Sequence, residues 1–495
     1  MTGDGQTTAV GPLPATDTEP TPRTPVVLTR LVWLLWVGSL GVVAARLLLG
    51  GPWTAAGFVV DGLTVVMWTV VTLFSAVVHS YSRRYMAGTP GVSRFFTRLS
   101  GFTVAVLVLV AADHIALFAL AWLAMGLVMA DLIGHVRGWP QARAAARLAR
   151  RHFLASTAAL ALALGVLWWT TGGTTVSGLA TAGDALGTAA WVAVAGLVLA
   201  AMVQSALVPF HGWLLASMTA PTPASALMHA GFVNAGGILL ARFAPLVSLD
   251  PTAMLLVLVA GAASALLGKL LKAVQTDVKR QLGCSTVGQM GFMIMQAGLG
   301  FFGAAVTHLV LHGFYKAYQF LSAGEGVERT SPERGPPEPR GTSVPGVLVT
   351  LLTGLAGGAL FAWLTGKGTS LDSGLVLTLL VVVLVVHATW DLLRRGSLPT
   401  TVRYAAVPAV GLPAIALYAL VYTAVTGLLA GLPVVTAPVE LTAAHGAVAV
   451  AFLLAYVAVE TGAYRRSRRL YVALVNASQP PTATLLTAPE EYSEY

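Results

Sequence analysis

Residues 302–323 form the stretch FGAAVTHLVLHGFYKAYQFLSA, an apolar run long enough to cross a membrane as one helix. Similar runs recur along almost the whole chain. Of its 495 residues, 56% are hydrophobic and 10% are charged, and the mean hydropathy is +0.78. Because a soluble domain carries about 25% charged residues, this chain cannot cover a water-facing surface. The sequence predicts an all-α polytopic membrane protein that lies in a lipid bilayer.

The apolar runs on either side of this stretch predict about 13–14 transmembrane helices. The predicted spans lie at residues 26–50, 54–80, 98–112, 114–135, 153–171, 187–208, 223–246, 252–275, 284–300, 302–323, 345–366, 372–393, 404–430 and 441–462. The polar segments between and around them predict a disordered cytoplasmic tail over 1–25, a first membrane block over 26–323, a cytoplasmic linker over 324–344, C-terminal transmembrane helices over 345–464 and a cytoplasmic tail over 465–495.

Basic residues gather in the gaps on one side of this topology, from Arg83 and Arg84 to the cluster Arg465–Arg469, whereas the opposite side holds Lys367 and little else. The positive-inside rule makes the basic side cytoplasmic, so both termini are expected inside the cell. The net charge of +9 lies in short gaps and forms no basic domain, which excludes a nucleic-acid binder. A single cysteine, Cys284, excludes disulfides and Cys-ligated clusters within the chain.

Three ionisable residues of the 302–323 run share one stripe of its helix: His308, His312 and Lys316 follow each other at intervals of four. Ionisable groups at bilayer depth cost on the order of 2.5–3.5 kcal/mol each and usually face a bundle interior or a wet cavity. Imidazoles titrate near neutral pH, so such a line can pass protons. Two alternatives are snorkelling or capping side chains, and a zinc site, although no third zinc ligand accompanies the histidines.

A second candidate is His229, which follows Pro221 and Pro223 and precedes Gly231, Gly236 and Gly237. Proline and glycine interrupt helices, and a membrane protein tolerates free backbone groups only around a buried or hydrated cavity. The pattern therefore predicts a proline-broken helix beside a histidine that binds or passes an ion. Ordinary hydrogen-bonded packing of this histidine is the alternative.

The remaining polar groups in the spans are Gln204, Asn234 and Gln289, which could hold a water wire, and Lys269, which either snorkels or lines a channel. Asp113, Asp131, Asp391 and Glu460 lie near span ends as interfacial carboxylates. The C-terminal spans carry no recognisable site. The sequence contains no phosphate-binding loop, dinucleotide fingerprint, haem motif or nucleophile elbow. The sequence therefore predicts an ion-conducting protein and not an enzyme, with no cofactor and no metal in this chain.

Three segments resemble a known family. They are DGLTVVMWTVVTLFSAVVHSYSRRYMAG…SRFF (61–96), PFHGWLLASMTAPTPASALMHAGFVNAGG (209–237) and QTDVKRQLGCSTVGQMGFM…HLVLHGFYKAYQFLSAG (275–324). They are similar to the antiporter-like subunits of respiratory complex I, especially subunit L, and of Mrp sodium/proton antiporters. The resemblance implies a proton-conducting core over the first block. Family members pair a glutamate with a lysine where this chain has Leu123 and Gln204, which argues against an ordinary complex I pump module.

The length and the C-terminal spans look most like the DabB-type membrane component of the inorganic carbon transporters of prokaryotic cell (inner) membranes. That resemblance implies a large cytoplasmic Dab-type partner, similar to a zinc β-carbonic anhydrase, so that zinc is expected in the partner. Protons or Na+ would enter around His308, His312 and Lys316, cross by water near Gln204, Asn234 and His229, and leave by Lys269 or Lys316. A complex I-type or Mrp-type component is the alternative function, and a structural scaffold is a third.

Overall fold

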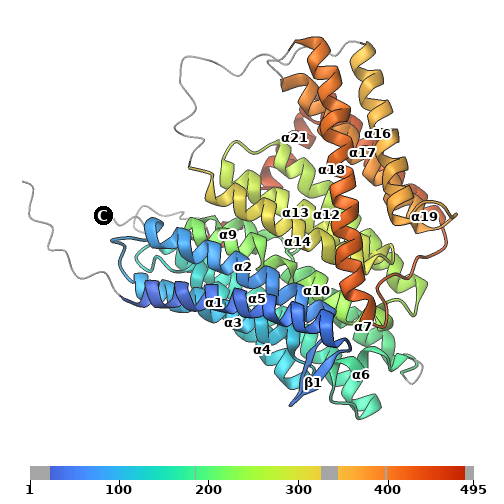
Figure 1. The fold of residues 1–495 in the computed structure, drawn as a ribbon. Coiled ribbons are helices and arrows are strands. Elements are labelled where there is room, and N and C mark those ends of the chain that lie inside the picture. The colour runs from blue at the N-terminus through green and yellow to red at the C-terminus, as the bar shows by residue number, and fades with distance from the viewer. Residues whose placement is uncertain (1–22, 184–185, 325–343, 396–398, 485–495) are drawn as a thin grey trace, which may run out of the picture.

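The computed structural model describes residues 23–183, 186–324, 344–395 and 399–484, and nearly all of them are helical (Figure 1). The first block holds α1 (Arg23–Leu49), α2 (Gly62–Tyr85), α3 (Val92–Ala111), α4 (Ile115–Ile133), α5 (Pro140–Thr171), α6 (Val176–Ala180), α7 (Ala189–Gln204), α8 (Gly212–Ala216), α9 (Thr222–Ala230), α10 (Ala235–Arg242), α11 (Ala244–Val247), α12 (Pro251–Ala273), α13 (Val278–Gly298) and α14 (Phe302–Leu321). The second block holds α16 (Val344–Thr365), α17 (Ser373–Arg395), α18 (Thr400–Leu428), α19 (Ala443–Glu460), α20 (Ala463–Arg466) and α21 (Arg468–Ala477).

Eleven helices of the described residues are long and apolar enough to cross a membrane, which confirms a multi-pass membrane protein. The sequence predicts about 13–14 crossings, and the difference arises from three predicted spans that also form helices. Of these, α7 has only 16 residues, while α13 and α14 carry polar side chains such as Gln296, His312 and Lys316. Those polar groups are buried within the protein, so they lower the hydropathy of their helices without facing lipid.

The predicted span 54–80 begins later than expected, because residues 53–60 form a small antiparallel hairpin of β1 (Trp53–Ala55) and β2 (Phe58–Val60). Its turn places Ala56 and Gly57 at φ of 49° and 80°. Two successive residues with positive φ match the twist of a tight hairpin, and glycine takes that conformation without strain. Asp61 then caps α2 by accepting a hydrogen bond from the Thr64 nitrogen at 2.9 Å.

Helices α12 and α13 pack extensively against each other. Gly268 of α12 faces Gly288 of α13 so closely that a Cβ on Gly268 would overlap the Gly288 backbone. Small residues allow such backbone approach between membrane helices, where close packing takes the place of a hydrophobic driving force. This contact fixes the rotation of α12 and therefore the direction in which the neighbouring Lys269 points.

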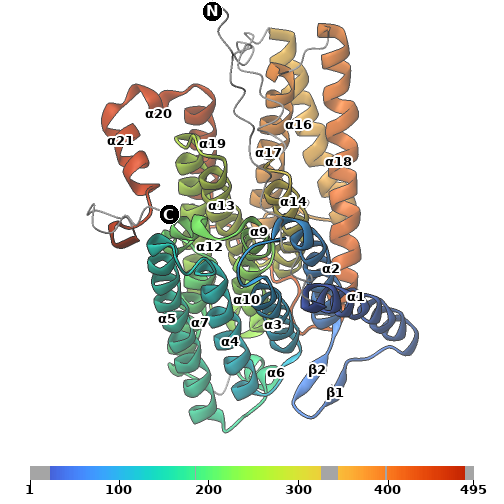
Figure 2. The same ribbon diagram turned by 90° about the vertical axis from the view of Figure 1, so that its left-hand side faces the viewer.

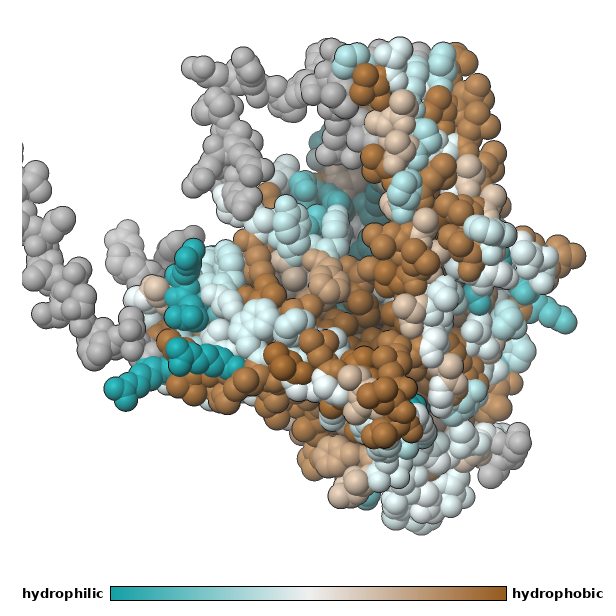
Figure 3. Space-filling model, viewed as in Figure 1, coloured by the Kyte–Doolittle hydropathy of each residue, from teal (hydrophilic) through white to brown (hydrophobic). Residues whose placement is uncertain are grey.

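The C-terminal helices form a group of their own that packs against the first block. In Figures 1 and 2, α16, α17 and α18 stand together, with α19 beside α12. A second apolar core joins the two blocks, with Leu258 and Met295 from the first and Leu377 and Ile415 from the second. Apolar side chains also cover much of the outer face over α1 and α18 (Figure 3), as expected of surfaces that meet lipid.

After α19 the chain returns to the first block through α20 and α21. Arg280 donates a hydrogen bond to Gln479 at 3.1 Å, and Gln275 bonds Ser478. The predicted tail 465–495 therefore contains a packed helix over Arg468–Ala477. Residues 325–343 of the predicted linker, 1–22 of the first tail and 485–495 lie outside the described residues. The predicted domain boundaries stay predictions.

Candidate functional site

Two of the predicted histidines, His229 on α9 and His312 on α14, meet in the interior of the first block. His312 Nε2 lies 3.2 Å from the backbone carbonyl oxygen of His229. The ring of His229 stacks on Phe320 with 4.5 Å between centroids. Both histidines are buried, so neither snorkels to the membrane surface.

The predicted break in the helix beside His229 is present. α9 ends at Ala230, a short 3-10 turn spans Phe232–Asn234, and α10 begins at Ala235. The interruption frees backbone carbonyls for other donors. The carbonyl of His229 faces His312, and that of Ala230 accepts the Asn234 amide at 2.7 Å. The broken helix thus supplies the acceptor that orients His312.

Hydrogen bonds around His229 assign its tautomer. The Thr286 hydroxyl donates its one proton to the Leu282 carbonyl at 2.9 Å. It must then accept a proton from His229 Nδ1, which lies 2.9 Å away. His229 Nε2 is left as an acceptor, and it has no partner among the described residues. Lys316 shares this arrangement, because its ammonium donates to the same Leu282 carbonyl at 3.0 Å.

In His312, too, one ring nitrogen is a donor and the other is an acceptor. Its Nε2 faces a carbonyl and therefore carries the proton, so that Nδ1 is an acceptor without a partner in the described part of the chain. The ring of His308 stacks on that of His312 with 5.8 Å between centroids. We refer to His229, His312 and His308 as the histidine line. Each ring keeps one nitrogen for a water molecule or a passing proton.

Gln204 and Asn234 are also buried, and they extend the polar interior beyond the histidine line. Neither the amide oxygen nor the amide nitrogen of Gln204 has a hydrogen-bond partner among the described residues, and the same holds for the Asn234 oxygen. Buried polar atoms are nearly always satisfied by protein or by water. The positions of these side chains therefore fit the predicted water wire, although no hydrogen bond joins Gln204 directly to His229 in the described chain.

Lys269 lies apart from this group and points toward the C-terminal helices. Its Nζ is 2.7 Å from His387 Nε2 on α17, and His387 Nδ1 is 2.8 Å from Glu460 Oε1 at the end of α19. Between the blocks lies a cavity of about 670 Å³, lined by His308, Gln296, Lys269 and His387 among others. Sequence reasoning missed His387 and treated Glu460 as an interfacial carboxylate. The sequence feature that could have indicated this site is His387, an ionisable residue inside the apolar run 372–393.

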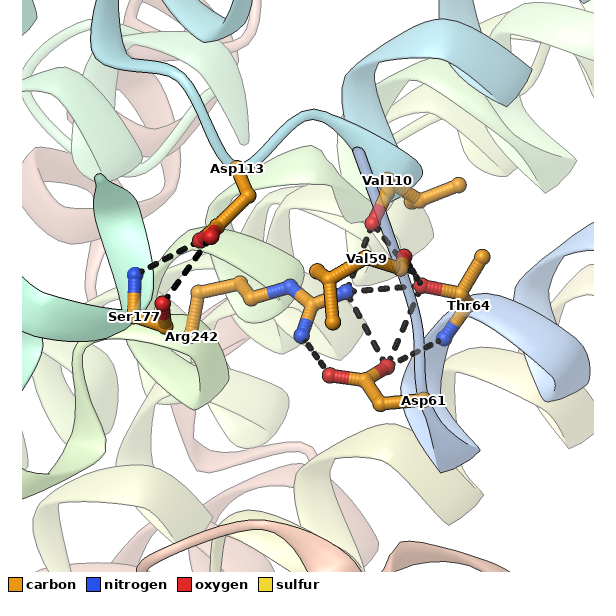
Figure 4. A network of polar contacts seen from close by, with 7 residues as sticks. All are labelled: Val59, Asp61, Thr64, Val110, Asp113, Ser177 and Arg242. Atoms are coloured by element: carbon orange, nitrogen blue, oxygen red, sulfur yellow. Dashed lines mark hydrogen bonds and ion pairs between the residues drawn. The ribbon is translucent and has the colours of Figure 1, made fainter. Parts of the chain in front are cut away.

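A further ionisable residue, Arg242, also escaped the sequence analysis. Figure 4 shows its guanidinium among Asp61, Thr64 and the Val110 carbonyl. It pairs with both carboxylate oxygens of Asp61 and donates to Thr64 Oγ1 at 2.9 Å and to the Val110 carbonyl at 2.6 Å. We refer to Asp61, Thr64, Val110 and Arg242 as the Arg242 cluster.

The Arg242 cluster ties the start of α2 and the end of α3 to the end of α10. Burial acts to raise the pKa of the Asp61 carboxyl, but Arg242 and the hydrogen bonds from Thr64 together hold this pKa below its ordinary value. Beside it, Asp113 accepts two hydrogen bonds from Ser177, at 2.8 Å and 3.0 Å, and thereby holds α6 (Figure 4). Asp61, Arg242 and Asp113 are thus each held by hydrogen bonds to neighbouring elements.

Within the described residues, no group of three or more His, Cys, Asp or Glu side chains is arranged to hold a metal ion. The two stacked imidazoles of His308 and His312 stand without a carboxylate or thiolate partner in that part of the chain. The arrangement of the histidine line suits the passage of protons more than it suits metal binding.

Residues 112–391 match the family model of the NADH:quinone oxidoreductase/Mrp antiporter transmembrane region. The chain belongs to this family. Residues 51–96 also match the N-terminal region of complex I chain 5. The antiporter-like resemblance predicted from the sequence is therefore confirmed, and members of this family are ion-translocating membrane subunits.

Among curated relatives, the chain is similar to "Probable inorganic carbon transporter subunit DabB1" of Halothiobacillus neapolitanus, with 39% identity over 58% of this chain and 53% of that protein. The corresponding DabB protein of Bacillus subtilis is 37% identical over 66% of this chain and 64% of its own length. "NADH-quinone oxidoreductase subunit L" of Mycobacterium tuberculosis is 37% identical over 56% of this chain and 44% of its own length. The matches thus span about half the length of these relatives.

Two solved structures share the fold. One is the Mrp complex from Dietzia sp. DQ12-45-1b, with a TM-score of 0.56 and 23% identity over 93% of this chain and 51% of that chain. The other is the membrane-bound sulfane sulfur reductase, an archaeal respiratory membrane complex, with a TM-score of 0.58 and 17% identity over 93% of this chain and 96% of that chain. Both are complexes, and at these identities the likeness shows a shared fold.

Proposed function

We propose that this chain is the ion-conducting membrane component of an energy-coupled inorganic carbon transporter. Protons, or Na+, pass through its first block and drive a large cytoplasmic partner, similar to a zinc β-carbonic anhydrase, that hydrates CO2 to bicarbonate. The observation that carries ion conduction is the histidine line, in which each ring keeps one buried nitrogen unpartnered within the described chain. The Dab-type names of the relatives support inorganic carbon as the substance that the complex transports.

In this proposal the protein is a multi-pass protein of a prokaryotic inner membrane with both termini in the cytoplasm. Water at the unpartnered ring nitrogens passes the proton among His229, His312 and His308, whose ring stacks on that of His312. Water near Gln204 and Asn234 completes the crossing. Lys316 fixes the Leu282 carbonyl and, through Thr286, the tautomer of His229. The chain lacks the family's acidic residue at Leu123 and basic residue at Gln204, which suits conduction down a gradient.

Proton flux into proteoliposomes tests conduction. The purified full-length chain, with the proteins that accompany it, is reconstituted, and an imposed membrane potential drives protons toward an entrapped pH-sensitive dye. Alanine at both His308 and His312 should lower the flux at least tenfold. The same assay with entrapped Na+ indicator decides between the ions. Wild-type flux of both ions in the double variant would contradict the proposal.

A mild-detergent pull-down of the tagged chain with mass spectrometry tests the partner. One large soluble protein with Cys, His and Asp zinc ligands supports the inorganic carbon function. The similarity to subunit L and the fold shared with the Mrp complex favour a second candidate, an antiporter-like component of a complex I-type or Mrp-type assembly. A set of quinone-reductase or Mrp proteins in the pull-down would support that candidate and overturn the first.

A further inference from the structure

We propose that His387 and Glu460 of the C-terminal helices form, with Lys269, an additional proton-binding site through which the path leaves the antiporter-like core. This inference rests on the proposed function, because it extends the path of the same ion. It assigns a role to helices for which the sequence indicated none. We refer to Lys269, His387 and Glu460 as the His387 relay.

The geometry of the His387 relay is that of a bridging imidazole. Lys269 Nζ lies 2.7 Å from Nε2 and Glu460 Oε1 lies 2.8 Å from Nδ1 of the same ring. The ring can take a proton on one nitrogen while it gives up the proton on the other. When the lysine ammonium protonates Nε2, the Nδ1–H bond breaks and the proton moves to the Glu460 carboxylate. The lysine becomes a neutral amine, the imidazole stays neutral in its other tautomer, and the carboxylate becomes a carboxylic acid.

The cavity of about 670 Å³ connects this relay to the histidine line. His308 lines one part of the cavity, and Lys269 and His387 line another. Gln289 and Gln296 lie along the same walls and offer amide groups to water. The cavity wall is mainly apolar, and these amide groups are among the few polar groups that lie between His308 and Lys269.

The surroundings of the relay restrict where a proton goes next. Tyr456 packs edge-on against the ring of His387 with 5.9 Å between centroids. The side chains of His387 and Glu460 keep 30% and 17% of their surface exposed, so neither group is sealed within the protein. Glu460 is the last residue of α19, at the boundary with α20, and it lies beyond the residues 112–391 that the family model matches. The site is therefore built partly from a region outside the matched core.

The test uses the full-length chain with its accompanying proteins in proteoliposomes, and measures proton flux with an entrapped pH-sensitive dye. Glu460→Gln and His387→Gln should each lower the flux at least tenfold. The double variant should be no worse than either single variant, because both break one relay. Glu460→Asp, which keeps the carboxylate, should retain most of the flux. Glu440→Gln is the matched control, since Glu440 is an exposed carboxylate away from the cavity, and it should leave the flux unchanged.

A second variant tests the cavity without touching an ionisable group. Ala388 lines the cavity and is exposed to it, so Ala388→Phe should obstruct it and lower the flux severalfold. Ala424→Phe, on an exposed position of α18 outside the cavity lining, is its control. These variants keep the test decisive if Glu460→Gln or His387→Gln fails to fold.

The outcomes separate this inference from the proposed function. If alanine at both His308 and His312 abolishes flux while the relay and cavity variants conduct like wild type, the His387 relay is overturned and conduction through the histidine line stands. Wild-type flux in the His308/His312 variant contradicts the proposed function. Loss of flux in all of these, with full flux in the two controls, supports the relay.

Discussion

The Arg242 cluster and the histidine line both place ionisable side chains inside the first block, yet they satisfy them differently. Both carboxylate oxygens of Asp61 and both terminal nitrogens of Arg242 are paired, and of the guanidinium only the donor Nε has no partner among the described residues. Each histidine of the line instead keeps one ring nitrogen without a partner in the described chain. A buried charge that is paired holds helices together, whereas an unpaired acceptor attracts water and can exchange a proton. Burial alone therefore does not mark a transport residue.

The largest expected effect comes from breaking the Arg242 cluster on one side. Arg242→Met leaves Asp61 buried without its partner and should lower the free energy of unfolding by about 3–5 kcal/mol. Thermal unfolding in detergent measures it. In the control Asp61→Asn/Arg242→Met the buried charge is gone, and most of the stability should return. A single variant as stable as wild type would show that the cluster does not hold these helices.

A smaller effect is expected at Thr286, which forms a hydrogen bond with His229 of the histidine line. Thr286→Val removes the acceptor of His229 Nδ1, so stability should fall by about 1–3 kcal/mol and proton flux severalfold, because the tautomer of His229 is no longer fixed. Thr307→Val is the matched control. Thr307 is buried on α14 and bonds its own helix, at the Gly303 carbonyl. Unchanged flux in Thr286→Val would remove His229 from the path.

The pH dependence of stability tests whether the ionised carboxylate of Asp61 stabilises the Arg242 cluster. Because the pKa of Asp61 is lower in the folded state than in the unfolded state, its stabilisation is complete above the unfolded value of about 3.9 and is lost as pH falls through the folded value. Each unit of pKa difference is worth about 1.4 kcal/mol. The unfolding temperatures of wild type and Asp61→Asn, compared from pH 7 to pH 3, should converge only at the acid end. A constant difference throughout would contradict this assignment.

The smallest effect on transport is expected at His79. This histidine has partners for both ring nitrogens, unlike the residues of the histidine line. His79 on α2 is fully buried, but Nδ1 lies 2.7 Å from the Ser75 carbonyl and Nε2 lies 2.9 Å from Ser100 Oγ. With both nitrogens partnered, it has none left for a passing proton. His79→Gln should therefore leave proton flux within about twofold of wild type while it lowers stability by about 1 kcal/mol. A tenfold loss of flux would contradict the distinction between the two kinds of site.

Much of the fold and part of the candidate site were predictable from the sequence. Long apolar runs predicted the membrane helices because lipid requires each crossing segment to satisfy its own backbone. The four-residue spacing of His308, His312 and Lys316 predicted their common stripe, since a helix repeats every 3.6 residues. The prolines and glycines around His229 predicted the broken helix, because those residues interrupt backbone hydrogen bonding.

Other features depended on residues far apart in the chain. Arg242 meets Asp61 across 181 positions, and Lys269 meets His387 across 118. No periodicity in the sequence pairs such residues, because their approach depends on how helices rotate and cross. The contact of Lys316 with the Leu282 carbonyl, 34 positions away, is of the same kind, whereas the bond of Thr286 to that carbonyl lies within one helix.

The sequence by itself determined that this is a multi-pass membrane protein of the antiporter-like family with ionisable groups inside its spans, because hydropathy and helical periodicity are local properties. Only the tertiary structure decided which of those groups are paired and which keep an atom for water. It paired the charge of Arg242 with that of Asp61 and left each histidine of the line with an unpartnered nitrogen within the described residues. It also brought Lys269 to His387 and Glu460, because the contact at Gly268 and Gly288 sets the rotation of α12 against α13.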